Sequence, residues 1–259
     1  MELYHRELAT DSDLPPILMM HGLFGSSSNL LAVGKALSTQ RSVILPDLRN
    51  HGRSPHDDDV SYQAMAQDVL QMLDDLGYEQ VDVLGHSMGG KVAMWLALNF
   101  PERINHLIVA DISPVNYPNR FAELLALLAD LDINHIESRK DADQQLANFI
   151  EEKSLRDYLL QNLVFRDGVW QWRMNLKALT AGIETITAFP LTHQEYDKPV
   201  LFLKGEHSAY LADKYLDDLY RLFPLAEIIV VEGAGHWLYA EQPENFMNAI
   251  HSFCCRSAS

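Results

Sequence analysis

Residues 81–98 contain the feature that most narrows the folds open to this chain. Val81-Asp82-Val83-Leu84 carries Val and Leu in a run that is too short for a helix and predicts the end of a buried strand. The motif Gly85-His86-Ser87-Met88-Gly89 follows directly, and Lys91 to Leu98 have the length and composition of a helix. A G-x-S-x-G motif between a strand and a helix is typical of a sharp turn that exposes the serine hydroxyl. We therefore predict that Ser87 is a nucleophile rather than part of a purely structural turn.

Short apolar strands and helical patterns alternate along most of the chain. Besides the strand before Ser87, buried strands are predicted at 17–20, 42–46, 104–110, 200–203 and 228–231, with further helices at 29–37, 62–76 and 212–222. Such alternation predicts an α/β fold with a mostly parallel sheet and helices on both faces.

From Pro114 to Asp197 the alternation stops, and the pattern is helix-like without a strong strand. Because this stretch lies between two predicted strands, we expect residues 114–197 to be an inserted helical cap, or lid, over the C-terminal ends of the strands. Residues 1–113 and 198–259 then form the core of the protein.

A serine hydroxyl needs a base within hydrogen-bond reach. His236 follows the last predicted strand in Gly233-Ala234-Gly235-His236, where the ligand-facing loops of parallel sheets lie. His21 and His86 also follow strands beside glycines, but we expect His86 to point away from its neighbour Ser87 and His21 to brace the first loop. We predict that His236 is the base; the alternative is a surface loop histidine.

The base in turn needs a third group that fixes its tautomer and steadies the imidazolium. The usual position for this acid is the loop after the strand at 200–203, in a Gly-x-x-Asp pattern. Here that loop contains Gly205-Glu206-His207-Ser208, so Ser208 stands where the carboxylate is expected. Asp111, at the end of the strand that follows the serine motif, and Glu206 are the two alternatives. We favour Asp111 over Glu206, and over an interpretation in which Asp111 only caps the chain as it leaves the sheet.

An acyl-transfer serine also needs hydrogen-bond donors for the oxyanion of its tetrahedral intermediate. The backbone N–H of Met88, next to the nucleophile, is one predicted donor. The loop His21-Gly22-Leu23-Phe24-Gly25 follows the first core strand, and its glycines permit close approach. The N–H of Leu23 is therefore the second predicted donor.

Side chains beside these groups are candidates for substrate binding. Phe24 and Trp237 adjoin the predicted oxyanion donor and the predicted base, and Arg49, Asn50 and His51 belong to a polar loop. For the last three, a network that braces the loop is an equal alternative. Apolar side chains of the expected cap either wall an acyl pocket or form a core of their own; these are Phe121, Leu124, Leu128, Trp170, Trp172 and Met174.

Together these motifs resemble the α/β-hydrolase fold, and the resemblance covers almost the whole chain. It rests on four segments in this order: His21 to Ser26, Asp47 to Ser54, Gly85 to Gly90 and Gly233 to Trp237. The second segment, together with Asp111-Ile112-Ser113-Pro114, is more narrowly similar to the small bacterial YbfF-type esterases and their mitochondrial relatives. The resemblance implies a serine carboxylic-ester hydrolase with a helical cap, active on small acyl esters, with acyl thioesters such as acyl-CoA as a further substrate class. In that family an acid after the strand following the serine turn is a known variation, which favours Asp111.

The charge of the chain excludes some partners. Its 259 residues carry a formal net charge of −16, which disfavours binding to a nucleic-acid backbone. No pair of His, Cys or carboxylate residues has convincing metal-ligand spacing, and no glycine-rich loop matches a nucleotide fingerprint, so we expect neither a metal nor a cofactor. The expected partner is a small-molecule ester or thioester. A CoA thioester would need basic residues at the mouth of the site, for which the sequence offers Arg49, Arg53, Lys91, Arg120 and Lys204.

The location of the protein is inferred from its ends and its cysteines. The first residues lack the pattern of a signal peptide, and no apolar run has membrane-spanning length. The two cysteines, Cys254 and Cys255, are adjacent, so no disulfide framework is expected. These features favour a cytoplasmic location without a membrane partner, and the sequence leaves the oligomeric state open.

Two other functions fit the same scaffold. A receptor-like protein would bind a ligand with little turnover, but such a protein has no need of the serine, the histidine and the oxyanion loop together. A C–C hydrolase or a lyase would use the same groups on a different bond, and a panel of esters, thioesters and β-diketones separates these chemistries.

Overall fold

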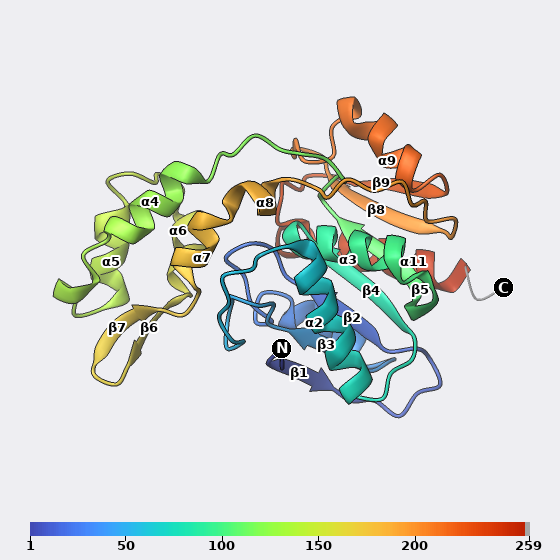
Figure 1. Cartoon of the computed structure of the whole chain (residues 1–259), viewed down its shortest axis with the longest axis horizontal. Helices are drawn as coiled ribbons and strands as arrows, with labels where there is room; N and C mark the ends of the chain where they lie inside the picture. The colour runs from blue at the N-terminus through green and yellow to red at the C-terminus, as the bar shows by residue number, and fades with distance from the viewer. Residues whose placement is uncertain (257–259) are drawn as a thin grey trace.

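A seven-stranded sheet lies at the centre of the computed structural model, which describes residues 1–256 (Figure 1). The strands lie side by side in the order β1-β3-β2-β4-β5-β8-β9. β1 pairs antiparallel with β3, and every other neighbouring pair is parallel. This confirms the predicted α/β fold with a mostly parallel sheet. The strands are β1 (His5–Leu8), β2 (Ile17–Met20), β3 (Val43–Pro46), β4 (Val81–His86), β5 (Ile104–Ala110), β8 (Val200–Gly205) and β9 (Ala226–Val231).

Helices cover both faces of this sheet. They are α1 (Leu31–Leu37), α2 (Tyr62–Asp75), α3 (Met88–Asn99), α9 (Leu216–Leu222), α10 (Leu238–Glu241) and α11 (Pro243–Arg256), with short 3-10 turns at Pro101–Arg103 and Asp213–Tyr215. In β2, Ile17 and Met19 join one buried cluster while Leu18 and Met20 join the other, because successive side chains of a strand point to opposite faces. The first cluster also holds α1, α10 and α11, and the second holds α2, α3 and α9.

The segment between β5 and β8 forms a group of short elements beside the sheet, at the left of Figure 1. Its helices are α4 (Ala122–Asp130), α5 (Arg139–Leu146), α6 (Lys153–Leu160), α7 (Leu176–Ala181) and α8 (Ile183–Thr187), with a 3-10 turn at Ile133–His135. The segment also contains two strands, β6 (Leu163–Arg166) and β7 (Val169–Trp172), that pair with each other and not with the central sheet.

This β6–β7 hairpin corrects the expectation that residues 114–197 contain helices without a strand. Asp167 and Gly168 connect the two strands, and both have positive φ angles, 52° and 83°. Two consecutive residues of this kind form the tight turn that matches the twist of paired strands, and Asp-Gly is a favoured pair for it. Phe165 and Trp170 face each other across the hairpin with ring centroids 5.3 Å apart. The Asp-Gly pair between aromatic and branched residues is the signal that the helical interpretation overlooked.

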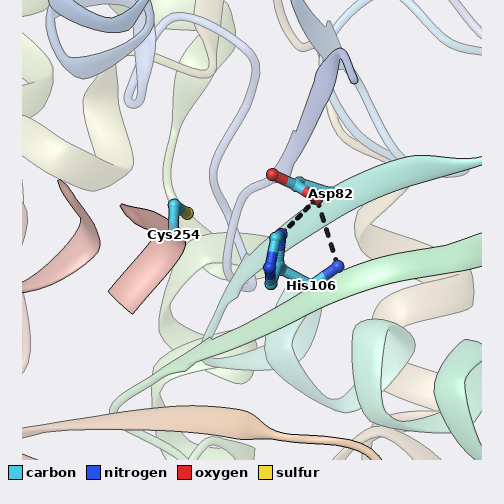
Figure 2. Close-up of side chains that lie close together, drawn as sticks. All are labelled: Asp82, His106 and Cys254. Carbon is cyan, nitrogen blue, oxygen red and sulfur yellow. Dashed lines mark hydrogen bonds and ion pairs between the residues drawn. The ribbon is translucent and has the colours of Figure 1, made fainter. Parts of the chain in front are cut away.

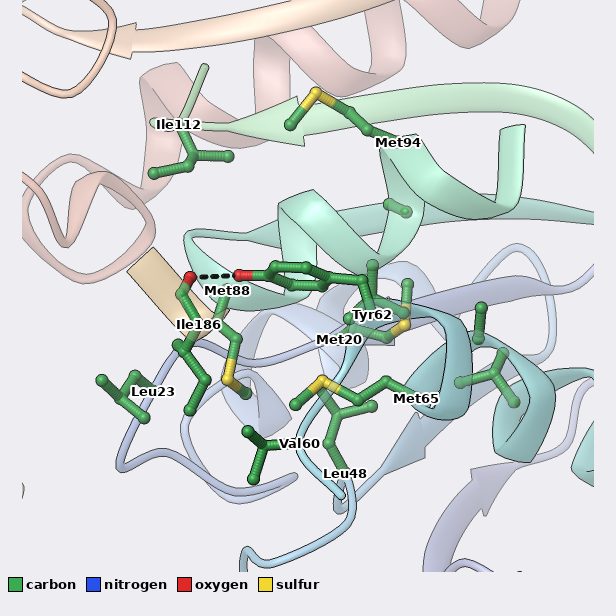
Figure 3. Packing of buried hydrophobic residues seen from close by; sticks show 14 of the residues in the cluster. Met20, Leu23, Leu48, Val60, Tyr62, Met65, Met88, Met94, Ile112 and Ile186 are labelled. Atoms are coloured by element: carbon green, nitrogen blue, oxygen red, sulfur yellow. Dashed lines mark hydrogen bonds between the residues drawn. The ribbon is translucent and has the colours of Figure 1, made fainter. Parts of the chain in front are cut away.

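Tyr62 of α2 is fully buried beneath the serine turn. Figure 3 shows its ring close to Met20 and Met88, and its hydroxyl donates to the carbonyl oxygen of Ile186 in α8, 2.5 Å away. The hydrophobic core under the sheet therefore continues into the segment between β5 and β8.

Two findings concern expectations about location and cysteines. No helix in the described part of the chain is both long and apolar enough to cross a bilayer. The side chain of Cys255, one of the two residues for which no disulfide was expected, lies outside the described part.

Candidate active site

Ser87 occupies a sharp turn between β4 and α3. Its φ angle is +53°, a left-handed conformation that non-glycine residues rarely adopt, and its backbone N–H donates to the carbonyl oxygen of Ala110 at 3.0 Å. A Cβ atom on Gly85 would lie 2.2 Å from the carbonyl oxygen of Gly89, and one on Gly89 would lie 2.5 Å from that of Met20. The two glycines of the motif are therefore needed for the close approach of β4, α3 and β2 that presents Ser87.

Asp111 and His236 form a hydrogen-bonded pair at the same edge of the sheet. The Asp111 carboxylate is fully buried, and its Oδ2 lies 2.7 Å from Nδ1 of His236. Since a buried carboxylate accepts, Nδ1–H of His236 is the donor, which leaves Nε2 of the ring as an acceptor. Asp111 directly follows β5 with a φ of +53°, and this strained conformation turns its side chain toward the loop after β9.

Ser208, which occupies the usual position of the acid in the loop after β8, also contributes to this pair. The hydroxyl of Ser208 donates to Oδ2 of Asp111, and the backbone N–H of Gly205 donates to Oδ1 at 3.0 Å. Glu206 lies elsewhere: its carboxylate accepts from the backbone N–H of Gly233 at 2.7 Å and is about half exposed. Of the two alternatives for the acid, Asp111 is the one that the structure brings to His236. Ser208 is a site residue that the sequence interpretation treated only as a vacancy.

The imidazole of His236 lies beside the rings of His86 and Tyr210, and His86 also binds the backbone of His236. Nε2 of His86 donates to the carbonyl oxygen of His236 at 2.8 Å, so the His86 side chain is turned to the backbone of the base. The rings of His86 and Tyr210 lie 4.7 and 4.3 Å from the His236 ring, centroid to centroid. Burial, and then the nearby His236, lower the pKa of His86 well below its usual value, so His86 is neutral at pH 7.

A cleft of about 930 Å³ opens beside these residues. Ser87, His236, Leu23, Phe24 and Trp237 all line it. Leu23, Ser87 and Met88 also line a small adjoining chamber of about 30 Å³, so both predicted oxyanion residues lie at the serine. The segment between β5 and β8 contributes a mostly apolar wall to the cleft, made of Phe121, Leu124, Leu127, Phe149, Leu155 and Tyr158.

The structure places Arg49, Asn50 and His51 away from this cleft, which corrects the expectation that they line its mouth. Arg49 is buried and makes two hydrogen bonds to Asp68, at 2.6 and 3.0 Å. The side chain of Asn50 accepts from the backbone N–H of Asp57, and Nδ1 of His51 donates to the carbonyl oxygen of Arg49. These partners lie in or beside the same loop and in α2, although Nδ2 of Asn50 and Nε2 of His51 are buried with no hydrogen-bond partner among the described residues. These residues therefore form the bracing network that was the alternative.

Other sequence candidates divide between cleft and core. Phe121 and Leu124 line the cleft, whereas Leu128 and Met174 are buried in the core and Trp170 and Trp172 pack against it. Of the five basic candidates for a CoA site, Arg120 lines the cleft. Lys91 is buried, and the other three, Arg49, Arg53 and Lys204, are not among its lining residues.

The sequence of residues 15–243 matches the family model described as the alpha/beta hydrolase fold. The chain belongs to the α/β-hydrolase family. Within it, the chain is a hydrolase of the carboxylesterase type, as three similar proteins indicate.

This hydrolase is 41% identical over 261 residues to the mouse protein named sn-1-specific diacylglycerol lipase ABHD11, covering 98% of this chain and 85% of the mouse protein. It is 36% identical to esterase YbfF of Escherichia coli K12, with 92% of each chain covered. A solved structure described as a marine microorganism esterase superposes with a TM-score of 0.93 at 36% identity, covering 97% of this chain and 99% of the other. The expected resemblance to YbfF-type esterases is confirmed.

In the described part of this hydrolase, one group of side chains combines the ligand types of a metal site. Figure 2 shows Asp82, His106 and Cys254, whose ligand atoms lie within 4.8 Å of one another. Asp82 already pairs with Nη1 of Arg41 at 2.6 Å and accepts from His106 and Asn105. Burial alone would raise the pKa of Asp82, but the His106 hydrogen bond and the Arg41 charge hold it below its usual value.

The charge of the Asp82 carboxylate is thus balanced within the protein by Arg41. Asp82 pairs in register with Ile17, the first residue of β2, so the group lies at the opposite end of β4 from Ser87. We describe it as a buried ion pair of the scaffold rather than as part of the cleft.

Proposed function

We propose that this hydrolase cleaves carboxylic esters in two steps through an acyl-enzyme on Ser87. His236 acts as general base and then as general acid, and Asp111 orients it. The observation that carries the proposal is the Asp111–His236 pair, 2.7 Å apart, in the cleft that Ser87 also lines. Ester hydrolysis agrees with the esterase and lipase names of the relatives.

The proposed chemistry follows from the tautomer. Nδ1–H of His236 is held by Asp111, so Nε2 takes the proton of the Ser87 hydroxyl as its oxygen attacks the acyl carbon. The imidazolium then gives this proton to the leaving alkoxide, and water releases the acid by the same route in reverse. The backbone N–H groups of Met88 and Leu23 hold the oxyanion; removing one such donor typically costs about 10²–10³ in kcat.

The cleft favours an ester with an apolar acyl chain and no strong negative charge. Its wall contains Phe121, Leu124 and Leu127, which bury hydrocarbon. The charged lining residues are Arg120 and three glutamates, Glu123, Glu152 and Glu241. A CoA thioester, with its several phosphate charges, would meet this acidic surface, so we propose neutral esters as the substrate class in preference to acyl-CoA.

We also propose that residues 114–197 act as the cap of this site. Two hydrogen bonds support this role: the Tyr158 hydroxyl donates to the carbonyl oxygen of Leu23 at 2.8 Å, and Asn162 Nδ2 donates to that of Phe24 at 2.7 Å. The cap thereby contacts the backbone of the loop that carries a proposed oxyanion donor.

Labelling with a fluorophosphonate probe tests the nucleophile. Wild-type protein and Ser87→Ala are treated in parallel, the labelled peptide is sequenced by mass spectrometry, and hydrolysis of p-nitrophenyl acetate is measured alongside. We expect the label on Ser87 alone, with labelling and turnover lost in the variant. Ligand binding without labelling or turnover of the wild type would favour a receptor-like protein, and cleavage of β-diketones but not esters would favour a C–C hydrolase.

A further inference from the structure

Lys91 is a buried lysine one helical turn after Ser87, with 2% of its surface exposed. Its Nζ donates to the carbonyl oxygens of Val115 at 3.0 Å, of Thr187 at 2.7 Å and of Ala188 at 2.7 Å. All three hydrogens of the ammonium are used on main-chain oxygens. Among the described residues, no carboxylate forms a salt bridge with this amine.

The three carbonyls belong to the two crossings between the core and the cap. Val115 lies on the chain from β5 to α4, and Thr187 and Ala188 lie where α8 ends and the chain returns to β8. The crossings also bind each other, since the N–H of Tyr117 donates to the Thr187 carbonyl at 3.0 Å. Lys91 thus fastens both crossings to α3, the helix that begins at the nucleophile.

The first crossing determines where the apolar wall of the cleft lies. It leads directly into α4, and Phe121, Leu124 and Leu127 at the start of that helix line the cleft. We propose that Lys91 is a positioning residue that holds the crossing leading into α4 against the nucleophile helix and thereby sets the preference of the enzyme for long apolar acyl chains over short ones. The Tyr158 and Asn162 hydrogen bonds keep the far side of the cap attached, so loss of the Lys91 contacts shifts α4 without releasing the cap.

The protonation of Lys91 gives this role a pH dependence. The titratable groups that face Nζ are the phenols of Tyr62 and Tyr117, with ring centroids 5.9 and 4.8 Å away, and Tyr210 across the small chamber. Burial raises the pKa of each phenol, so all three are neutral near pH 7. Burial lowers the pKa of Lys91 to about 7. A neutral amine has two hydrogens for three carbonyls, so the fastening weakens as the pH rises through 7.

The first test uses the wild-type enzyme and compares two substrates from pH 5.5 to 9. The ratio of kcat/KM for p-nitrophenyl octanoate to that for p-nitrophenyl acetate is measured at each pH. An effect of pH on the chemical step that both esters share cancels in the ratio. We expect the ratio to fall as the pH rises, with a midpoint near 7, mainly through a higher KM for the octanoate. A ratio that stays constant over this range would overturn the proposal.

The second test replaces the lysine. Lys91→Met keeps the apolar stem and removes the three donors; Lys198→Met is the matched control, because Lys198 also donates to two main-chain carbonyls, of Pro101 and Ile104, and is not among the residues that line the cleft. We expect Lys91→Met to lower the octanoate-to-acetate ratio of kcat/KM at pH 6 about fivefold, a difference of about 1 kcal/mol. The ratio should then no longer depend on pH. Lys198→Met should behave like the wild type.

The two tests separate this inference from the proposed function on which it rests. If Ser87→Ala hydrolyses acetate as fast as the wild type, the proposed function fails. If acetate hydrolysis depends on Ser87 but Lys91→Met retains the wild-type ratio and pH profile, or loses both esters in equal proportion, the role of Lys91 fails. Should Lys91→Met not fold, Lys91→Gln and the wild-type profile still decide the outcome.

Discussion

At the scale of single residues, the choice between two carboxylates determines how His236 is oriented. Asp111→Asn keeps the shape of the side chain but presents an amide where the structure has an acceptor for Nδ1–H. We expect kcat for p-nitrophenyl acetate to fall by about 10³–10⁴, because the imidazole is then held in the wrong tautomer. Glu206→Gln is the comparison, and we expect it to change kcat by less than about threefold, because Glu206 bonds to the backbone of Gly233. A larger loss in Glu206→Gln than in Asp111→Asn would reverse the assignment.

Ser208 offers a control that restores the acid rather than removing it. Its hydroxyl already donates to Oδ2 of Asp111, the oxygen that pairs with His236. A carboxylate introduced as Ser208→Asp in the Asp111→Asn background therefore lies near Nδ1. We expect this double variant to regain at least tenfold in kcat over Asp111→Asn, about 1.4 kcal/mol of barrier. No gain would mean that the loop after β8 cannot carry the acid in this protein.

Residues marked by a short sequence motif were predicted correctly, whereas residues whose environment is set by distant parts of the chain were not. Ser87 and His236 were predicted from glycine-flanked positions after strands, and the structure brings both to one cleft. Arg49 was misjudged because its partner Asp68 lies in α2, 19 positions further along the chain. Lys91 was named as a candidate cation for CoA at the mouth of the site. The sequence did not reveal that it is buried, because the carbonyl oxygens that it binds belong to residues 24 and about 96 positions away.

At the scale of elements, the contact of α3 with the sheet is made through glycine. Gly89→Ala would place a Cβ 2.5 Å from the carbonyl oxygen of Met20, which is backbone and cannot move aside. We expect this variant to lose about 3 kcal/mol or more of unfolding free energy, measured from its urea midpoint. Gly77→Ala has a positive φ of 78° but no atom within 4 Å of the added Cβ, and we expect it to lose about 1–2 kcal/mol. Equal losses of unfolding free energy in the two variants would mean that the close approach of Gly89 to Met20 does not determine the loss of stability.

The elements of the central sheet and its helices were easier to predict than those of the segment between β5 and β8. Strands such as Ile17–Met20 are buried on both faces and stand out as unbroken apolar runs. In the segment between β5 and β8, apolar residues face either the hydrophobic core or the cleft, as Leu128 and Leu124 do on one helix. The spacing of apolar residues alone does not separate these two fates. The β6–β7 hairpin was missed for a different reason, because its signal is the Asp167-Gly168 turn rather than a period.

At the scale of the whole molecule, buried histidines make the free energy of unfolding depend on pH. Burial lowers the pKa of His21, of His86 and of His51, the last to about 3, whereas an unfolded histidine titrates near 6.5. Between the folded and the unfolded pKa, the unfolded chain binds the extra protons, so the free energy of unfolding falls as the pH drops below about 6.5. Lys91 acts in the same direction at higher pH, because its folded pKa of about 7 lies below that of an exposed lysine.

His51→Gln isolates one of these groups. His51 is fully buried in the bracing network, outside the cleft lining, and donates from Nδ1 to the carbonyl oxygen of Arg49. The loss of unfolding free energy between pH 7.5 and pH 5.5, measured with urea, should be smaller in this variant than in the wild type by about 1.4 kcal/mol, the value of one proton per pH unit below 6.5. His193→Gln, at an exposed position, should leave the wild-type difference unchanged. If His51→Gln also leaves it unchanged, His51 is protonated in the folded protein at pH 5.5, and the bracing network must then hold a buried charge.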